Sequence, residues 1–191
     1  MKIVLNAVLE GEGGEMNKEL KKTLQGVGMT FGDIVEMDKL EIKKKITEKD
    51  NEEWKRELEK RKSLGLYQEF KSEMREERSY YNNFSSKLLF AARSNTMELN
   101  ELRERWGKGS SRCDLCGEEK EDLEHFVLKC PSLENKRGGV IGRFRRNGDR
   151  DTLGILLFET RGDDCEEVKA MLRDLWGERD KIRGRRGVGR G

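Results

Sequence analysis

The sequence predicts a mainly α-helical fold, and three observations support this prediction. Over residues 33–106, apolar side chains recur three or four positions apart, which places them on one face of a helix. Residues 41–78 hold twelve cations and eleven anions, spaced so that opposite charges can pair four positions apart on a helix surface. The chain contains a single proline, which excludes Pro-rich linkers and collagen-like repeats.

Length and composition limit the number of domains, the size of the hydrophobic core and the class of protein. The 191 residues correspond to one or two small domains. Charged residues make up 41% of the chain, against roughly 25% in an average globular domain. No apolar stretch approaches the about 20 residues of a membrane span, and the N-terminal stretch lacks a signal-peptide cleavage pattern. We therefore expect an intracellular protein of the nucleus or cytoplasm, in a reducing compartment and without a membrane partner.

The first two segments differ in their glycine content. Residues 1–33 are predicted to be a loosely ordered lead-in, because six glycines interrupt a short apolar run. Residues 34–106 are predicted to be a helical region. Within it, Asp50-Asn51-Glu52-Glu53 resembles a capping box, which predicts that a second helix starts near Asp50.

The best candidate for the hydrophobic core lies in residues 79–106. Four of its apolar residues fall on one stripe of an amphipathic helix: Tyr81, Phe84, Leu88 and Ala91. Packing is the favoured interpretation of the aromatic residues, and base stacking is the alternative. The predicted core comprises Trp54, Phe70, Tyr81, Phe84, Leu88 and Trp106.

The most informative pattern surrounds the only histidine. Three of the four cysteines combine with it as C-x2-C-x8-H-x4-C, formed by Cys113, Cys116, His125 and Cys130. Zn2+ prefers thiolate and imidazole ligands in a tetrahedron, and a two-residue gap lets one turn aim two sulfurs at one point. We predict one structural Zn2+, because a catalytic zinc keeps an open position. A redox Cys-x-x-Cys pair and unrelated buried cysteines are the alternatives.

The same residues predict how the module is built. Gly117 allows the first turn to close at positive φ. Glu121–Lys129 is predicted to be a short helix that carries His125. Cys130, five positions later, would lie about 140° around a regular helix. It is therefore expected where the helix unwinds, and Pro131 favours that unwinding.

The distribution of charge predicts where a partner approaches. Residues 113–130 carry six carboxylates and two lysines, so the module itself repels phosphate. Residues 137–150 carry a net charge of +4, and arginine suits bidentate phosphate recognition and base stacking. Nucleic-acid contacts are therefore predicted at Arg137, Arg143, Arg145, Arg146 and Arg150.

Three segments complete the predicted organisation. The CCHC zinc-binding module occupies residues 107–136. Residues 137–178 comprise a basic segment and a C-terminal helix, Glu166–Trp176, which begins beside Cys165. Cys165 is interpreted as a free thiol, with a substitute metal ligand as the alternative. Residues 179–191, with six cations and one anion, are predicted to be a basic disordered tail. The predicted fold is thus a small helical bundle, a CCHC module and a C-terminal helix.

The sequence resembles the C-terminal region of non-LTR (LINE-type) retrotransposon reverse transcriptases. The similarity runs from about Phe31 to Arg137. It is carried by Trp54, Leu66–Lys71, Ser85–Asn100, Cys113–Gly117, Glu124–Phe126 and Cys130-Pro131. The resemblance implies a region that lies downstream of the polymerase, binds zinc and helps the element's protein hold nucleic acid. It implies RNA or DNA, and the reverse transcriptase body, as partners.

The catalytic motifs of such elements are missing from this sequence. No Tyr-x-Asp-Asp-like turn joins apolar strands to supply metal-binding carboxylates, and Pro131 is followed by Ser instead of the Asp of the associated nuclease. We predict no enzyme activity, and a non-catalytic, zinc-dependent nucleic-acid-binding module that is a detached C-terminal fragment. The alternatives are a zinc-stapled protein-interaction scaffold, a non-functional gene remnant, and a nuclease. The nuclease would depend on Asp149, Asp151, Asp163 and Asp164.

Overall fold

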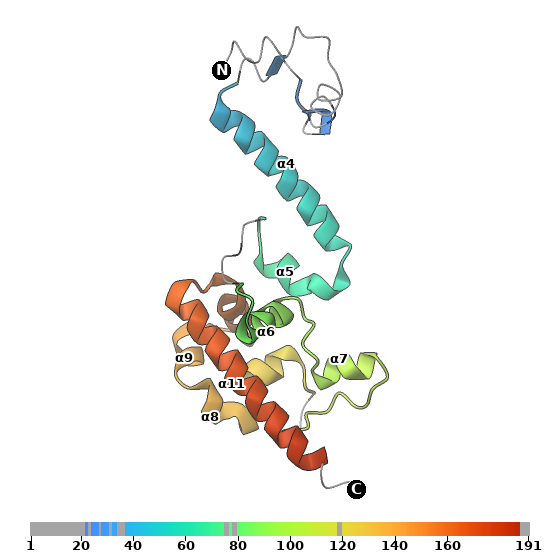
Figure 1. The fold of residues 1–191 in the computed structure, drawn as a ribbon, viewed down its shortest axis with the longest axis vertical. Coiled ribbons are helices and arrows are strands. Elements are labelled where there is room, and N and C mark those ends of the chain that lie inside the picture. The colour runs from blue at the N-terminus through green and yellow to red at the C-terminus, as the bar shows by residue number, and fades with distance from the viewer. Residues whose placement is uncertain are drawn as a thin grey trace. The chain divides into compact units, whose positions relative to one another are not determined.

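The fold is mainly helical, as predicted (Figure 1). The computed structural model describes residues 22, 24–26, 28–30, 32–33, 37–74, 77, 80–117 and 120–187, apart from the side chains of 39 and 185–187. Within these residues the only β-pairing is one isolated antiparallel bridge between Arg112 and Lys120. The predicted lead-in, residues 1–33, lies largely outside them. No helix in the described part of the chain is long and apolar enough to cross a bilayer.

The chain forms two compact units, residues 1–57 and 58–191. The first contains most of α4 (Lys39–Glu59). The Oδ1 of Asp38 caps this helix by accepting hydrogen bonds from the backbone N–H groups of Leu40 and Glu41, at 2.6 and 2.9 Å. The prediction of a helix start near Asp50 is wrong, because α4 continues through that residue and the capping carboxylate lies twelve residues earlier.

The second unit holds the helices that follow α4. In chain order they are η1 (Lys62–Leu64), α5 (Gly65–Phe70), α6 (Phe84–Arg93), α7 (Asn100–Arg105), η2 (His125–Lys129), η3 (Pro131–Leu133), α8 (Glu134–Arg137), α9 (Val140–Phe144), α10 (Asp149–Gly154), η4 (Ile155–Glu159) and α11 (Gly162–Gly187). Helix α11 packs against α6, α8, α9, η2 and η4. The predicted divisions at residues 106/107 and 136/137 therefore fall inside one unit.

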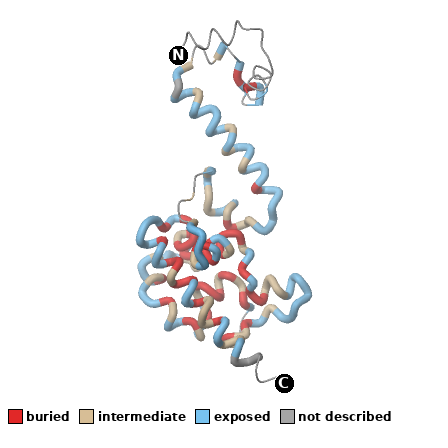
Figure 2. Tube along the Cα trace, viewed as in Figure 1, coloured by how far each residue is buried: buried red, intermediate tan, exposed pale blue. Residues whose placement is uncertain are grey.

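The core of the second unit is built around α11 (Figure 2). Its fully buried apolar residues come from α6, the segment after α7, the two π-helical turns η2 and η4, and α11. They include Leu89, Phe126, Val127, Leu133, Leu156, Leu157, Val168, Leu172 and Leu175. The residues that follow the first cysteine pair thus pack into the same core as the C-terminal helix.

The predicted core is wrong at three aromatic residues. Tyr81, Phe84 and Trp106 are exposed, whereas Leu88 is buried as predicted. For Tyr81 and Phe84 the reason is the start of α6 at Phe84, where the side chain of the N-cap Asn83 accepts a hydrogen bond from the backbone N–H of Ser86 at 2.8 Å. Trp106 instead lies at the C-terminal end of α7. The face that packs against α11 is then formed by Leu88, Leu89 and Ala92.

Helix α11 is longer than the predicted helix Glu166–Trp176. It extends to Gly187, so residues 179–187 are helical where the sequence predicted a disordered tail. Arg179 is buried and Ile182 packs against the core. The count of charges placed the end of the helix too early, because one of the six cations in residues 179–191, Arg179, faces the interior.

Gly154 at the end of α10 lies directly against the ring of Phe70. A Cβ added there would lie 2.6 Å from Cζ of Phe70 and closer still to two other ring atoms. We expect Gly154→Ala to lower the free energy of unfolding of the second unit by about 1–3 kcal/mol, because the ring must move out of a packed position. Urea denaturation measures this change.

Gly177→Ala in α11 is the matched control, since an added Cβ meets no atom within 4 Å there. We expect that variant to be more stable than the parent by about 0.5–1 kcal/mol, the usual gain for alanine over glycine inside a helix. Equal effects of the two substitutions would show that Phe70 does not restrict position 154.

Candidate metal centre

The first two cysteines come from a turn held closed by its own backbone. Cys113 is preceded by the Arg112–Lys120 bridge, and the N–H of Gly117 donates to the carbonyl of Cys113 at 2.9 Å. Gly117 has φ +79°, as predicted for this turn. This conformation strains residues that carry a Cβ. The turn therefore directs the side chains of Cys113 and Cys116 toward one point.

The other two candidate ligands come from the helical turn that follows. Asp122 caps it, because its Oδ1 accepts from the backbone N–H of His125 at 2.8 Å. The last turn is widened: the N–H of Cys130 donates to the carbonyl of His125, five residues earlier, at 2.7 Å. Cys130 itself leaves the helix with φ −53° and ψ 116°, immediately before Pro131.

This geometry agrees with the predicted unwinding and adds a feature that the sequence did not predict. Single wide turns of this kind are frequent at functional sites. Here the extra residue in the turn, together with the extended backbone of Cys130, brings the thiol to the histidine.

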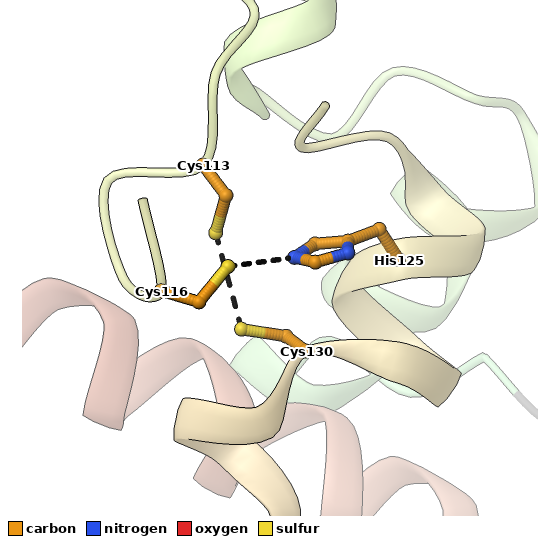
Figure 3. Close-up of side chains that lie close together, drawn as sticks. All are labelled: Cys113, Cys116, His125 and Cys130. Carbon is orange, nitrogen blue, oxygen red and sulfur yellow. Dashed lines mark hydrogen bonds between the residues drawn. The ribbon is translucent and has the colours of Figure 1, made fainter. Parts of the chain in front are cut away.

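The four side chains form one cluster (Figure 3). Their ligand atoms all lie within 4.8 Å of one another. The Sγ atoms of Cys113 and Cys130 are 3.9 Å apart, and the Sγ of Cys116 is 3.5 Å from the Nε2 of His125. Ligands in a zinc tetrahedron, with bonds of about 2.0–2.3 Å, are separated by about 3.5–3.8 Å. Cys113, Cys116, His125 and Cys130 are thus close enough to hold one metal ion.

The electrostatics of the cluster favour a thiolate at Cys113. A hydrogen bond from the Cys130 thiol lowers the pKa of Cys113, and the backbone N–H groups of Cys116 and Leu115 lower it further. The hydrogen bond that the Cys130 thiol donates to Cys113, followed by burial, raises the pKa of Cys130. The site therefore favours a first thiolate before any cation binds.

Cys165 lies apart from the cluster. It is buried in the hydrophobic core in the first turn of α11 and does not belong to the group of potential ligands.

A buried ion pair that the sequence did not predict connects the metal cluster to α11. Glu121 is 0% exposed and Arg179 is 1% exposed. The Nε and Nη2 of Arg179 donate to the two carboxylate oxygens of Glu121 at 2.7 and 2.8 Å. The guanidinium carbon of Arg179 also lies 4.9 Å from the ring centroid of Trp176. Glu121 had been counted among the acidic residues that repel phosphate, but its charge is neutralised inside the protein.

The same carboxylate organises the segment before the cluster. Glu121 accepts from the backbone N–H of Asn100 at 2.8 Å, and the side chain of Asn100 donates to the carbonyl of Arg112 at 2.8 Å. The backbone N–H of Glu121 donates to the carbonyl of Ser111 at 2.7 Å. Helix α7, the cysteine turn and α11 are therefore fixed to one another through two buried residues, Glu121 and Asn100.

Arg137, one of the predicted nucleic-acid contacts, is a structural residue. It is 2% exposed, its Nε donates to the carbonyl of Val127 at 2.8 Å, and its Nη1 pairs with Glu134 at 2.7 Å. This part of the predicted binding surface is wrong. The guanidinium packs beneath the π-helical turn instead of facing solvent.

The other four predicted contacts are exposed, but three of them form ion pairs with carboxylates of the protein itself. Arg143 pairs with Asp164 and Glu167 on α11. Arg150 pairs with Glu69 on α5 through both carboxylate oxygens. Arg145 lies 4.0 Å from Asp149. Only Arg146 has no ion pair with the described carboxylates. Much of the positive charge counted in residues 137–150 is therefore compensated locally.

Comparison of the chain with protein-family models, with curated proteins and with solved structures finds no match. The similarity to LINE-type reverse transcriptases accordingly depends on the sequence motifs alone.

Proposed function

We propose that this chain is a non-catalytic, zinc-dependent nucleic-acid-binding module, equivalent to the C-terminal region of a non-LTR retrotransposon reverse transcriptase. The observation that carries the proposal is the cluster of Cys113, Cys116, His125 and Cys130, whose ligand atoms lie within 4.8 Å of one another. The same four residues belong to the motifs in which the sequence resembles the C-terminal region of those reverse transcriptases. Three thiolates and one imidazole favour Zn2+ over harder cations, which prefer oxygen ligands.

A structural role for the metal follows from the number of protein ligands. Four protein ligands fill a tetrahedron and leave no position for a substrate or an activated water. Cys113, His125 and Cys130 are also buried. The metal would then hold the cysteine turn against η2, and the protein would act by presenting a surface. RNA or DNA, and the reverse transcriptase body, are the proposed partners, in the nucleus or cytoplasm where thiols stay reduced.

Binding to nucleic acid is tested by a titration over a range of salt. We expect zinc-loaded protein to bind a fluorescent oligonucleotide, with an affinity that falls steeply between about 50 and about 200 mM salt, because neutralised phosphates release counterions. Fluorescence anisotropy with single-stranded RNA, single-stranded DNA and duplex DNA measures it. Binding that is absent at low salt for all three probes contradicts the proposal.

The second candidate function is a zinc-stapled protein-interaction scaffold. It is favoured by three large aromatic side chains exposed at and beside α6: Tyr81, Phe84 and Phe90. Exposed apolar groups of this size mark interaction surfaces when they are contiguous. A folded, zinc-loaded protein without affinity for any oligonucleotide would favour this function.

A further inference from the structure

A pocket of about 470 Å3 lies beside the cysteine turn and is lined mainly by polar side chains. Four cations line it: Arg103 on α7, Lys108 and Arg112 in the segment leading to the cysteines, and Arg183 on α11. These residues were not among the predicted nucleic-acid contacts. They are brought together because α7, the cysteine turn and the end of α11 meet at this point.

The charge of the pocket is positive. Among the described residues that line the pocket, Asp114 is the one carboxylate, and it lies 3.5 Å from the Nε of Arg183. In the part of the chain that the structure describes, no carboxylate forms an ion pair with Arg103, Lys108 or Arg112. Burial, and then the like charges of Arg179 and Arg103, lower the pKa of Arg183. Cations crowded in this way favour a bound anion.

Two described carboxylates in the neighbouring segments are already paired with other cations. Glu121 is paired with Arg179 in the interior. Glu101 is paired with both Arg105 and Lys120. A metal held by three thiolates and one imidazole would add about one negative charge, against four cations and one carboxylate among the described residues of the lining.

The walls of the pocket allow an anion to approach the backbone. Gly109 and Gly117 line it with φ +119° and φ +79°, and neither presents a side chain. The guanidinium of Arg112 is oriented by a hydrogen bond from its Nε to the carbonyl of Gly117. Glycine is suited to such sites because the absence of Cβ allows close approach of a ligand.

An exposed aromatic residue stands next to these cations. Trp106 is 51% exposed and directly follows α7. The Nζ of Lys108, which lines the pocket, lies 5.3 Å from its ring centroid. An aromatic face beside a cationic groove is the combination that binds single-stranded nucleic acid, since the bases stack and the phosphates are neutralised.

We propose that this pocket binds a backbone phosphate of single-stranded nucleic acid while a neighbouring base stacks on Trp106. The inference rests on the proposed function and gives it a site and a preferred partner. A base inside a duplex is already stacked on its neighbours, so contact with the tryptophan requires a single strand. The surface closest to the metal thus attracts phosphate, in contrast to the prediction from the charge of residues 113–130.

The test compares two variants that each remove three positive charges. The pocket variant carries Arg103→Gln, Lys108→Gln and Arg183→Gln, and the control carries Arg143→Gln, Arg145→Gln and Arg146→Gln. Affinities are measured for an oligonucleotide of about 16 nucleotides, single-stranded and as a duplex. We expect the pocket variant to lose about tenfold or more in single-strand affinity and less in duplex affinity. The control should weaken both by a similar factor.

Trp106→Ala provides an independent measurement with no change of charge. We expect it to lower single-strand affinity by about fivefold or more, without a change in the salt slope. Zinc content and circular dichroism confirm that each variant is folded. If the pocket variant fails to fold, the single variants Trp106→Ala and Lys108→Gln test the proposal by their single-strand affinity.

The outcomes separate this inference from the proposed function. A parent protein that binds no oligonucleotide contradicts both. A parent that binds, while the pocket variant and Trp106→Ala keep parental single-strand affinity, overturns the inference and leaves the proposed function standing. Equal losses for single strand and duplex in the pocket variant also overturn it.

Discussion

Removal of zinc is expected to unfold the second unit of this protein as a whole. Phe126, Val127 and Leu133 belong to the segment that carries two of the four ligands, and all three are 0% exposed in the core shared with α11. Structural zinc contributes roughly 10–16 kcal/mol in small modules, which is comparable to the entire stability of a domain. The core around α11 should therefore not survive metal loss. Hydrogen exchange with and without a zinc chelator is the measurement.

Substitution of the ligands tests the metal site by the number of zinc ions bound per chain. We expect one zinc per chain in the parent and none in the Cys116→Ser, His125→Ala double variant, because two of four ligands are lost. Cys165→Ala is the matched control, since this cysteine is outside the cluster. Undiminished zinc in the double variant, or unchanged protection of residues 121–130 after chelation, would contradict the assignment. Acidification should also release the metal, because its ligands bind only when deprotonated.

Arg179→Met is expected to destabilise the protein by about 3–5 kcal/mol, the usual cost of leaving one member of a buried ion pair without its partner. Glu121 would remain fully buried, and its carboxylate would keep, from the described residues, one hydrogen-bond donor, the backbone N–H of Asn100. Urea denaturation of the zinc-loaded protein measures the change in the free energy of unfolding.

Arg173→Met is the control on the same helix. Arg173 is exposed, and among the carboxylates that the structure describes it pairs only with its neighbour Asp174, so we expect a change within about 0.5 kcal/mol. Glu121→Leu combined with Arg179→Met should recover much of the loss, because it removes both buried charges. Equal destabilisation by Arg173→Met and Arg179→Met would mean that the buried pair contributes nothing specific.

The parts of this molecule that could be predicted from the sequence are the local ones. The four ligands lie within eighteen residues, so their spacing and the proline after Cys130 were enough to indicate a metal cluster. Helical periodicity similarly predicted a mainly helical fold. Neither prediction depends on how distant segments pack.

The missed features all depend on tertiary contacts. Glu121 and Arg179 are 58 positions apart, and nothing in their local sequence distinguishes them from the other charged residues. Arg137 was counted as a surface cation for the same reason. The register of α6 depends on a cap at Asn83, which decides that Leu89 faces the core and Phe84 faces solvent. A count of charges or apolar residues cannot determine which side of a helix is covered.

The pair between Glu121 and Arg179 also determines how short a working version of this chain can be. A fragment that ends at residue 178 would retain Cys113, Cys116, His125 and Cys130, and by its sequence it would be a complete metal-binding module. It would nevertheless lack the guanidinium that neutralises Glu121, and with it the hydrogen bond from Arg179 to the carbonyl of Glu98. A nonsense mutation at any codon from 131 to 179 would thus damage a metal site whose every ligand is still encoded.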